Sequence, residues 1–291
     1  MKIALAQIDP TPTDFAANVS LHLETIAAAR AQQVNLIVFP ELSLSGDGTQ
    51  GDPAQMTISL DDERFQALVE ASTEMDIVVG VLEADDGKRY NSAVYLQDGA
   101  IRHVHRKVFL ATYATFFEDE FCVPGRGIHV FDTAAGRTNL LICNDIWHPL
   151  LPYMAGMHGT EIMLAPSNSA WSTQADQLKI AETWESLNRA YAGSLGVFLI
   201  FVNRVGARHV KGKDLQYWGG SEIIAPGGEL LAKAAYNDAE LLVFDIDLTL
   251  AQRQQQDADI FRDFDISAMQ AEFDHAVTAM QARREGLKQE G

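Results

Sequence analysis

Cys143 is the residue whose sequence setting most strongly suggests chemistry. It ends the apolar run 138–143, and the polar turn Asn144-Asp145 follows at once. A strand that stops at a cysteine presents the sulfur at its carboxyl end, the edge where α/β sheets gather their ligands. A free cysteine is more often buried and inert, so this stretch alone leaves open a nucleophile or a packing residue.

Two further ionisable residues also follow predicted strands. Glu41 comes directly after a strand over 36–39 and Pro40, and Lys107 closes a strand over 102–106. Alone, Glu41 is equally consistent with a solvated loop carboxylate, and a lysine such as Lys107 is usually a solvated surface charge. With Cys143 they form a coherent set, because a thiol becomes a strong nucleophile only when a base takes its proton and a cation stabilises the thiolate. Glu41 is the candidate base and Lys107 the candidate cation.

A second carboxylate, Glu118, lies in the aromatic segment 116–121. A carboxyl group buried among aromatic rings holds its proton more readily, which suits proton transfer, whereas an ordinary acidic loop is the alternative. When a thiolate attacks an amide carbonyl, negative charge develops on the oxygen. Lys107 and the backbone N–H of Asn144, directly after the nucleophile, are the expected donors to that oxygen.

Short apolar runs that alternate with amphipathic stretches must position these side chains. Helices are predicted around 15–26, with Asp14 as the N-cap, and around 65–72 and 178–187. Asp98-Gly99 predicts a hairpin turn. Strands are predicted over 2–7, 36–39, 77–82, 92–96, 128–131, 139–143, 161–165, 197–202 and 241–246. The order indicates an α/β fold, with either one mixed sheet or two sheets face to face between helices.

The composition excludes several classes of protein. The 291 residues carry 40 acidic side chains against 22 Lys plus Arg, a formal charge of −18. Nucleic acids and anionic membrane surfaces require basic patches, so we expect neither as a partner. No run approaches the roughly 20 apolar residues of a membrane span, and the first residues lack the apolar run of a secretory signal. With only Cys122 and Cys143 available for a disulfide, we expect a cytoplasmic protein.

The residues after 248 form a polar, helical tail in this prediction. Its apolar residues recur at spacings of three and four, which places them on one helical face. This stripe either packs on the body of its own chain or contacts a partner subunit. The stripe consists of Ile266, Met269, Phe273, Val277 and Met280.

Seven motifs, in order along the chain, carry a resemblance to a known family. They are Ile3-Ala4-Leu5-Ala6-Gln7, Phe39-Pro40-Glu41-Leu42 with Ser45-Gly46, Tyr90-Asn91-Ser92-Ala93, Arg106-Lys107-Val108-Phe109-Leu110, Cys143-Asn144-Asp145, Val202-Asn203-Arg204-Val205-Gly206 and Gly219-Gly220-Ser221. From Lys2 to about Asp245, the chain resembles the nitrilase superfamily of carbon–nitrogen hydrolases. The resemblance implies a four-layer αββα sandwich, here a single domain over 1–247, and a helical tail at 248–291 that joins a subunit contact. It therefore also implies a homodimer or a higher homo-oligomer.

The resemblance assigns roles to the candidate residues. It implies a Glu–Lys–Cys triad, carried here by Glu41, Lys107 and Cys143, and a second glutamate, Glu118, that positions the substrate and assists proton transfer. The implied reaction is hydrolysis of a small non-peptide amide through a thioester on Cys143, with release of ammonia or an amine. No cofactor and no metal are implied. The scattered histidines agree with this expectation, since His103 and His105 have no acidic or thiol ligand at close spacing.

The residues around the nucleophile favour one branch of this superfamily. Asp145 stands where nitrile-cleaving members usually carry Glu, and 146–148 lack the Arg that often binds a free carboxylate in N-carbamoyl and ω-amide hydrolases. The stretch looks most like amidases and the glutaminase domain attached to NAD synthetases. Tyr113, Trp147 and Ser169 are the expected substrate contacts in an aromatic pocket. Nitrile or N-carbamoyl hydrolysis, acyl transfer from the thioester and a non-catalytic scaffold remain as alternatives, and the intact catalytic set weighs against the scaffold.

Overall fold

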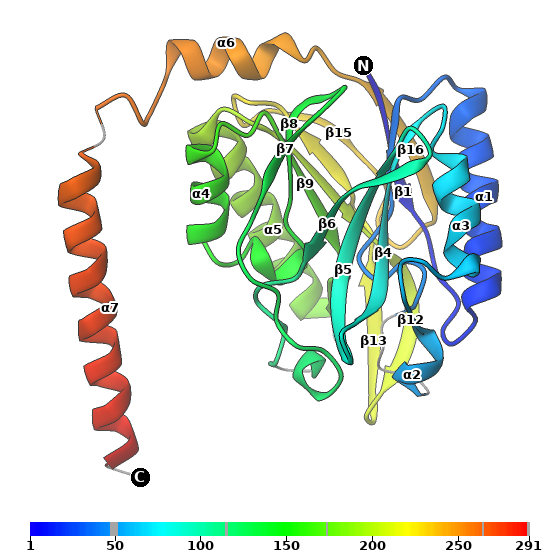
Figure 1. Ribbon diagram of the computed structural model, residues 1–291, viewed down its shortest axis with the longest axis horizontal. Coiled ribbons are helices and arrows are strands. Elements are labelled where there is room, and N and C mark those ends of the chain that lie inside the picture. Colours follow the sequence, from blue (N-terminus) through cyan, green and yellow to red (C-terminus); the bar gives the residue numbers. More distant parts are fainter. Residues whose placement is uncertain (47–51, 114–115, 173, 264, 290–291) are drawn as a thin grey trace.

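Two β-sheets stacked between helices make up most of the computed structural model, which describes residues 1–46, 52–113, 116–172, 174–263 and 265–289 (Figure 1). The first sheet has the order β16-β1-β2-β4-β5-β6, with β3 beside β4. Its strands are β1 Lys2–Gln7, β2 Leu36–Val38, β3 Thr57–Ile58, β4 Asp76–Asp85, β5 Lys88–Gln97, β6 Ala100–Arg106 and β16 Glu240–Asp245.

The second sheet has the order β15-β14-β11-β9-β8-β7, and a small third sheet has the order β10-β13-β12. The strands of the second sheet are β7 Val130–Thr133, β8 Gly136–Leu140, β9 Ile162–Ser167, β11 Phe198–Asn203, β14 Glu222–Ile224 and β15 Leu230–Lys233. Those of the third are β10 Ala170–Trp171, β12 Val205–Val210 and β13 Lys213–Trp218. The helices are α1 Phe15–Ala31, α2 Pro53–Met56, α3 Glu63–Ala71, α4 Leu150–Met157, α5 Gln174–Leu195, α6 Thr249–Asp257 and α7 Ile266–Gln289, with 3₁₀ turns η1 Glu118–Glu120 and η2 Cys143–Asp145.

Alternate residues of the first sheet face two different layers, because successive side chains of a strand point to opposite faces. On β1, Ile3 and Leu5 belong to the apolar core between the two sheets. Ala4 and Ala6 belong to a second core, which the sheet shares with α1 and α3. The second sheet is covered on its outer face by α4 and α5 (Figure 1). The fold is therefore the predicted four-layer αββα sandwich, with two stacked sheets rather than one mixed sheet.

Several predicted elements are confirmed closely. The strand β1 has the predicted bounds, and α1 begins after Asp14, whose Oδ1 accepts the Ala17 N–H at 2.9 Å. Asp98 and Gly99 connect β5 to β6 with φ values of 52° and 70°, the left-handed pair that a tight type I′ hairpin requires.

Two features of the sequence prediction need correction. The strand expected over 139–143 ends at Leu140, and Cys143 lies beyond it in η2, because its φ of +43° is one that no strand accommodates. The third sheet was not expected at all. Its hairpin turns at Lys211-Gly212, and its strands β12 and β13 pair antiparallel over their whole length.

The tail divides into a packed helix and a helix that stands apart. Ala251 of α6 is fully buried, and Gln255 donates from Nε2 to the carbonyl oxygen of Thr160 at 2.7 Å. Helix α7 extends away from the layered body (Figure 1). Its stripe is open to solvent, with Ile266 at 69% and Phe273 at 47% exposure, so the structure does not show the stripe packed on its own chain. Among the described helices, none is long and apolar enough to cross a bilayer.

Candidate active site

The loop after β2 places Glu41. Leu42 adopts a left-handed φ of 50°, which turns the chain sharply after the carboxylate. This loop lies directly on β4 at Gly80. A Cβ atom at Gly80 would come within 2.3 Å of the Leu42 nitrogen and 2.6 Å of the Pro40 carbonyl oxygen. Glycine at this position therefore permits the close approach that buries Glu41 to 2% exposure.

Lys107 follows β6 and is held by backbone contacts on both sides. Its N–H donates to the Asn91 carbonyl oxygen at 2.8 Å, and its own carbonyl oxygen accepts the Gly125 N–H at 2.8 Å. The side chain is 1% exposed. A lysine ammonium is buried so completely only when acidic partners surround it.

Cys143 opens the short 3₁₀ turn η2 after β8. Its φ of +43° belongs to the left-handed region that non-glycine residues seldom occupy and that concentrates at functional sites. The side chain is 8% exposed at the base of a cavity. The backbone N–H of Asn168, just after β9, donates to its sulfur.

Asp145 joins the cysteine turn to the segment that follows Lys107. Its carboxylate accepts the backbone N–H of Ile142 at 3.0 Å and those of Val108 and Phe109 at 3.0 and 2.9 Å. His105 donates a fourth hydrogen bond from Nε2 at 2.9 Å. Asp145 is fully buried, so these four hydrogen bonds replace the ones that water would otherwise make to its carboxylate.

Lys107 and Asn91 bridge two glutamates. Lys107 Nζ donates to Oε1 of Glu41 at 2.6 Å and to Oε1 of Glu118 at 2.8 Å. Asn91 Nδ2 donates to the same two oxygens at 2.7 and 3.0 Å. The other oxygen of Glu118 accepts the Ala111 N–H at 2.6 Å. The sequence prediction had quoted Asn91 within a motif without giving it a role.

One carboxylate oxygen of this cluster remains available. Glu41 Oε2 is buried and has no hydrogen-bond partner among the described residues. Burial, opposed by Lys107 and assisted by Glu118, raises the pKa of Glu41 to about 7. A carboxyl group with a pKa near neutrality and one unpaired oxygen is suited to accept and return a proton.

The pKa values of the Cys143 thiol and the Lys107 ammonium group are shifted as well. Burial, followed by the charge of Glu41, raises the pKa of Cys143 well above its ordinary value, against Lys107 and the Asn168 N–H. The resting thiol therefore keeps its proton. Burial disfavours the charge of Lys107, but Glu118, Glu41 and Cys143 outweigh it and raise the Lys107 pKa. The ammonium group of Lys107 therefore remains charged at neutral pH.

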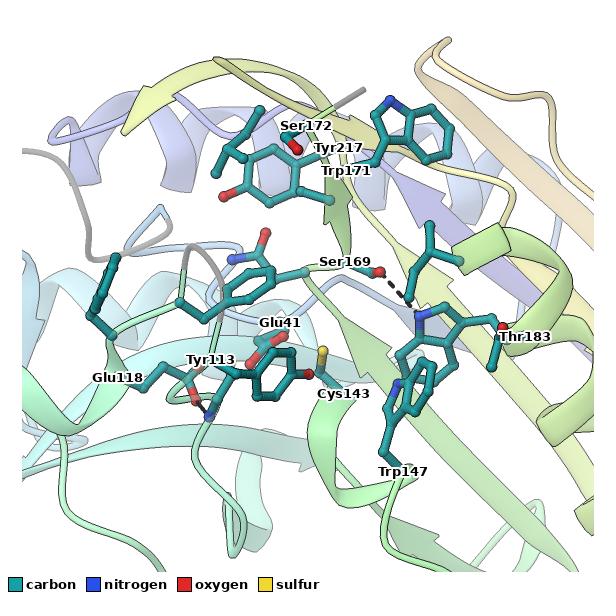
Figure 2. A pocket seen from close by; sticks show the side chains of 18 of the residues that line it. Glu41, Tyr113, Glu118, Cys143, Trp147, Ser169, Trp171, Ser172, Thr183 and Tyr217 are labelled. Carbon is teal, nitrogen blue, oxygen red and sulfur yellow. Dashed lines mark hydrogen bonds between the residues drawn. The ribbon is translucent and has the colours of Figure 1, made fainter. Parts of the chain in front are cut away.

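These groups line a cavity of about 360 Å³ (Figure 2). Glu41, Lys107, Glu118 and Cys143 all contribute to its wall, so the structure brings the four predicted residues together. The rest of the wall is mostly aromatic, which suits a ligand with an apolar body. The aromatic residues are Tyr113, Phe116, Phe117, Trp147, Trp171, Trp184 and Tyr217.

The three predicted substrate contacts also line the cavity. Tyr113 is 51% exposed, and its hydroxyl donates to Oδ1 of Asn144 at 3.1 Å. Trp147 meets Trp184 edge to face with centroids 5.5 Å apart. Ser169 Oγ accepts the indole N–H of Trp184 at 3.0 Å and that of Trp218 at 3.2 Å, so it also supports the aromatic wall.

Asn168 is a lining residue that sequence reasoning did not identify. It is 6% exposed, and its Oδ1 is one of the buried side-chain oxygens for which the described structure offers no hydrogen-bond partner. A buried amide oxygen without a partner is costly unless a ligand completes it. The sequence signal for Asn168 is its place directly after the buried strand β9, a place that it shares with Ser169.

Comparisons with known proteins agree with this geometry. An (R)-stereoselective amidase from a Pseudomonas species is 30% identical over 266 residues, which cover 90% of this chain and 91% of the relative. A glutamine-dependent NAD(+) synthetase from Thermotoga maritima is 26% identical over 251 residues, and the match covers 85% of this chain but only 42% of the relative. The chain thus spans less than half the length of the NAD synthetases it matches.

The fold has solved counterparts too. A carbon–nitrogen hydrolase from Helicobacter pylori G27 superposes with a TM-score of 0.81 at 24% identity, over 92% of this chain and 96% of that one. The family model described as carbon-nitrogen hydrolase matches residues 2–256, which include every side chain of the cluster described above. The chain belongs to the carbon–nitrogen hydrolase family.

Proposed function

We propose that this protein is a cysteine-dependent amidohydrolase that cleaves a small non-peptide amide through a thioester on Cys143. The observation that carries this proposal is the unpaired Glu41 Oε2 in the same cavity as the Cys143 thiol, with Lys107 between the two glutamates. A base, a nucleophile and a fixed positive charge at one cavity are the groups that acyl transfer requires.

The first half of the proposed reaction forms the thioester. As the Cys143 sulfur bonds to the amide carbon, its proton passes to Glu41 and the carbonyl electrons move onto oxygen. Lys107 Nζ and the N–H of Asn144, the second residue of the η2 turn, stabilise that oxygen, because the first N–H groups of a helical turn have no partner inside it. The C–N bond then breaks, Glu41 protonates the leaving nitrogen, and ammonia or an amine departs.

The second half returns the enzyme to its starting state. Water gives a proton to Glu41 while its oxygen bonds to the thioester carbon. The C–S bond breaks, the sulfur recovers the proton from Glu41, and the carboxylic acid is released. Glu118 remains hydrogen-bonded on both oxygens through this cycle and holds Lys107 and the loop at Ala111 in place. We assign it the positioning of substrate and the support of proton transfer.

An amide is favoured over the other substrates of such a site by two observations. An amidase relative is 30% identical and matches over nearly all of both chains. The Asn168 Oδ1 is an acceptor without a partner, and the N–H of an amide supplies the donor that a nitrile lacks. N-carbamoylputrescine amidases are also similar, for example that of Solanum lycopersicum at 25% identity, so carbamoyl compounds are a second candidate class.

Ammonia release from a panel of aliphatic and aromatic amides, glutamine, carbamoyl compounds and nitriles tests the proposal. Replacing Cys143 with Ala removes the nucleophile, so we expect turnover to fall by at least about a thousandfold while the fold persists. The matched control is Cys122→Ala, at a buried free cysteine that does not line the cavity.

Intact-mass measurement of the parent enzyme with a slow substrate should show an acyl adduct on Cys143. Adding hydroxylamine separates hydrolysis from acyl transfer, since a transferase yields the hydroxamate. Ammonia release by Cys143→Ala at the parent rate would exclude this function.

We also propose that the α7 stripe is covered by a second copy of the chain. Exposed apolar side chains gather on α7 and, on the body, at Leu150 and Met157 of α4 and at Leu250 and Ile260 of the α6 region. Helix α7 leaves the body from the end of that same α6 region (Figure 1). Two copies that exchange α7 bury both surfaces at once in a closed two-fold arrangement.

A further inference from the structure

The cavity has a polarity gradient along β13. Residues 213, 215 and 217 lie on one face of this strand because side chains alternate. Tyr217 is 1% exposed and Leu215 is 3% exposed, whereas Lys213 is exposed, and all three line the cavity. This wall therefore runs from a buried aromatic ring to a lysine at the solvent edge.

Helix α5 repeats the same gradient on another wall. Its lining residues are spaced so that they share one helical face. Trp184 is 1% exposed and contacts Ser169 at depth, Ile180 is half-buried, and Lys179 is exposed. On both β13 and α5, the lining residues thus run from a buried aromatic ring to an exposed ammonium group. We call these two lysines, Lys179 and Lys213, the outer rim of the cavity.

The outer rim is positive in a chain whose formal charge is −18. In the described part of the cavity wall, the only carboxylates are Glu41 and Glu118, and both accept hydrogen bonds from Lys107 at the base of the cavity. Neither rim lysine pairs with a carboxylate among the described residues. A positive end on an otherwise apolar cavity selects a ligand with an anionic group beyond an apolar body.

We propose that the outer rim binds an anion, so that the preferred substrates are amides with an aromatic or bulky apolar acyl group that ends in a carboxylate or similar anion. This inference rests on the proposed amide hydrolysis and names its substrate class. The amide reaches Cys143, the aromatic walls enclose the acyl body, and Lys179 and Lys213 meet the anion. The rim offers no carboxylate in its described part for the α-ammonium group of an amino acid amide such as glutamine.

Three matched substrates test the inference: 3-phenylpropanamide and its para-carboxyl and para-aminomethyl derivatives. We expect the parent enzyme to show the highest kcat/KM for the carboxylate and the lowest for the ammonium compound. In the double variant K179Q/K213Q, the ratio of kcat/KM for the carboxylate to that for the neutral amide should fall about tenfold, since each exposed charge pair contributes modestly. Added salt should lower the same ratio in the parent.

The control variant K2Q removes one lysine at the start of β1, outside the cavity, and should keep the parent ratio. The charge reversal K179E/K213E should move the preference toward the aminomethyl compound. An unchanged ratio in K179Q/K213Q, or a parent preference for the neutral or cationic amide, overturns the inference and leaves amide hydrolysis intact. Absence of Cys143-dependent ammonia release from every amide in the panel overturns the proposed function, and the inference with it.

Discussion

The proton equilibrium of Glu41 is the feature on which the proposed chemistry depends at the scale of single residues. One of its oxygens is shared by Lys107 and Asn91, and the other is unpaired and buried. The hydrogen bonds fix the carboxylate in place, and burial brings its pKa from 4.5 to about 7. Because the Cys143 pKa lies well above its ordinary value, a base with this pKa takes the thiol proton only as the sulfur bonds to the amide carbon, and it returns that proton readily to the leaving nitrogen.

We expect kcat/KM to rise as the pH increases through about 7, because only the ionised Glu41 accepts the thiol proton. Below that pH the carboxyl group carries its own proton, and activity falls about tenfold per pH unit. The pH profile of ammonia release measures this limb. A profile that is flat between pH 5 and 8 would contradict the assignment of Glu41 as the base.

The same shift affects stability with a definite sign. The folded state binds the Glu41 proton more tightly than the unfolded state, so the contribution of this group to the free energy of unfolding is fully present below about 4.5 and is lost as the pH rises toward 7. Denaturant unfolding of the parent and of Glu41→Gln at several pH values isolates this contribution. The stability of Glu41→Gln relative to the parent should increase with pH across this window.

At the scale of elements, the site depends on loops that several strands hold against each other. Asp145 connects η2 to the segment after β6 through three backbone N–H groups and His105. It contacts neither the cavity nor the reacting atoms in this arrangement, and we regard it as a positioning residue. Misplacing a nucleophile and its cation by about 1 Å costs roughly 100-fold in rate.

Asp145→Asn should therefore lower kcat by about 10- to 100-fold with a smaller change in KM. In this variant an NH₂ group replaces one carboxylate oxygen and faces N–H groups from which it cannot accept a hydrogen bond. The η2 turn therefore shifts relative to Lys107. The rate of Cys143 alkylation, followed by mass spectrometry, reports the shift without substrate. The control is Asp119→Asn, an exposed acid of the neighbouring η1 turn. Parent-like kcat and alkylation in Asp145→Asn would show that these hydrogen bonds do not position the nucleophile.

At the scale of the whole molecule, α7 is the part that the layered body does not explain. A solitary helix gains little stability in water, and its exposed stripe of large apolar residues needs a covering surface. In the dimer that we propose, the exposed apolar residues of α4 and of the α6 region on a second copy provide that surface, and the polar face of α7 stays in solvent.

The double variant Phe273→Glu/Met280→Glu places charges in the stripe, so we expect it to shift the protein to monomers in light scattering coupled to size exclusion. The matched control Ala271→Glu/Ala282→Glu adds the same charges to the opposite helical face and should leave the dimer unchanged. A parent protein that is monomeric at micromolar concentration, or a stripe variant that stays dimeric, would refute the exchange.

The sequence by itself determined the candidate side chains and the α/β class of the fold. Cys143 and Glu41 were recognisable because each comes at the end of an apolar run, where a polar turn interrupts the hydrophobic pattern, and Lys107 was recognisable as the residue that closes the strand over 102–106. The alternation of strands with amphipathic helices indicated an α/β fold, and the four-layer order was implied by the family resemblance that the motifs carry. Such signals are local, since they depend on residues within one or two turns of the chain.

Only the tertiary structure decided which side chains meet. Lys107 reaches Glu41 across 66 residues, and Asn91 joins both glutamates although its motif gave no indication of this role. The third sheet, which supplies Lys213 and Tyr217 to the cavity, was missed because its short strands mix polar with apolar residues. Contacts of this kind arise when packed sheets bring distant loops to one edge, and no local pattern records which loops those are.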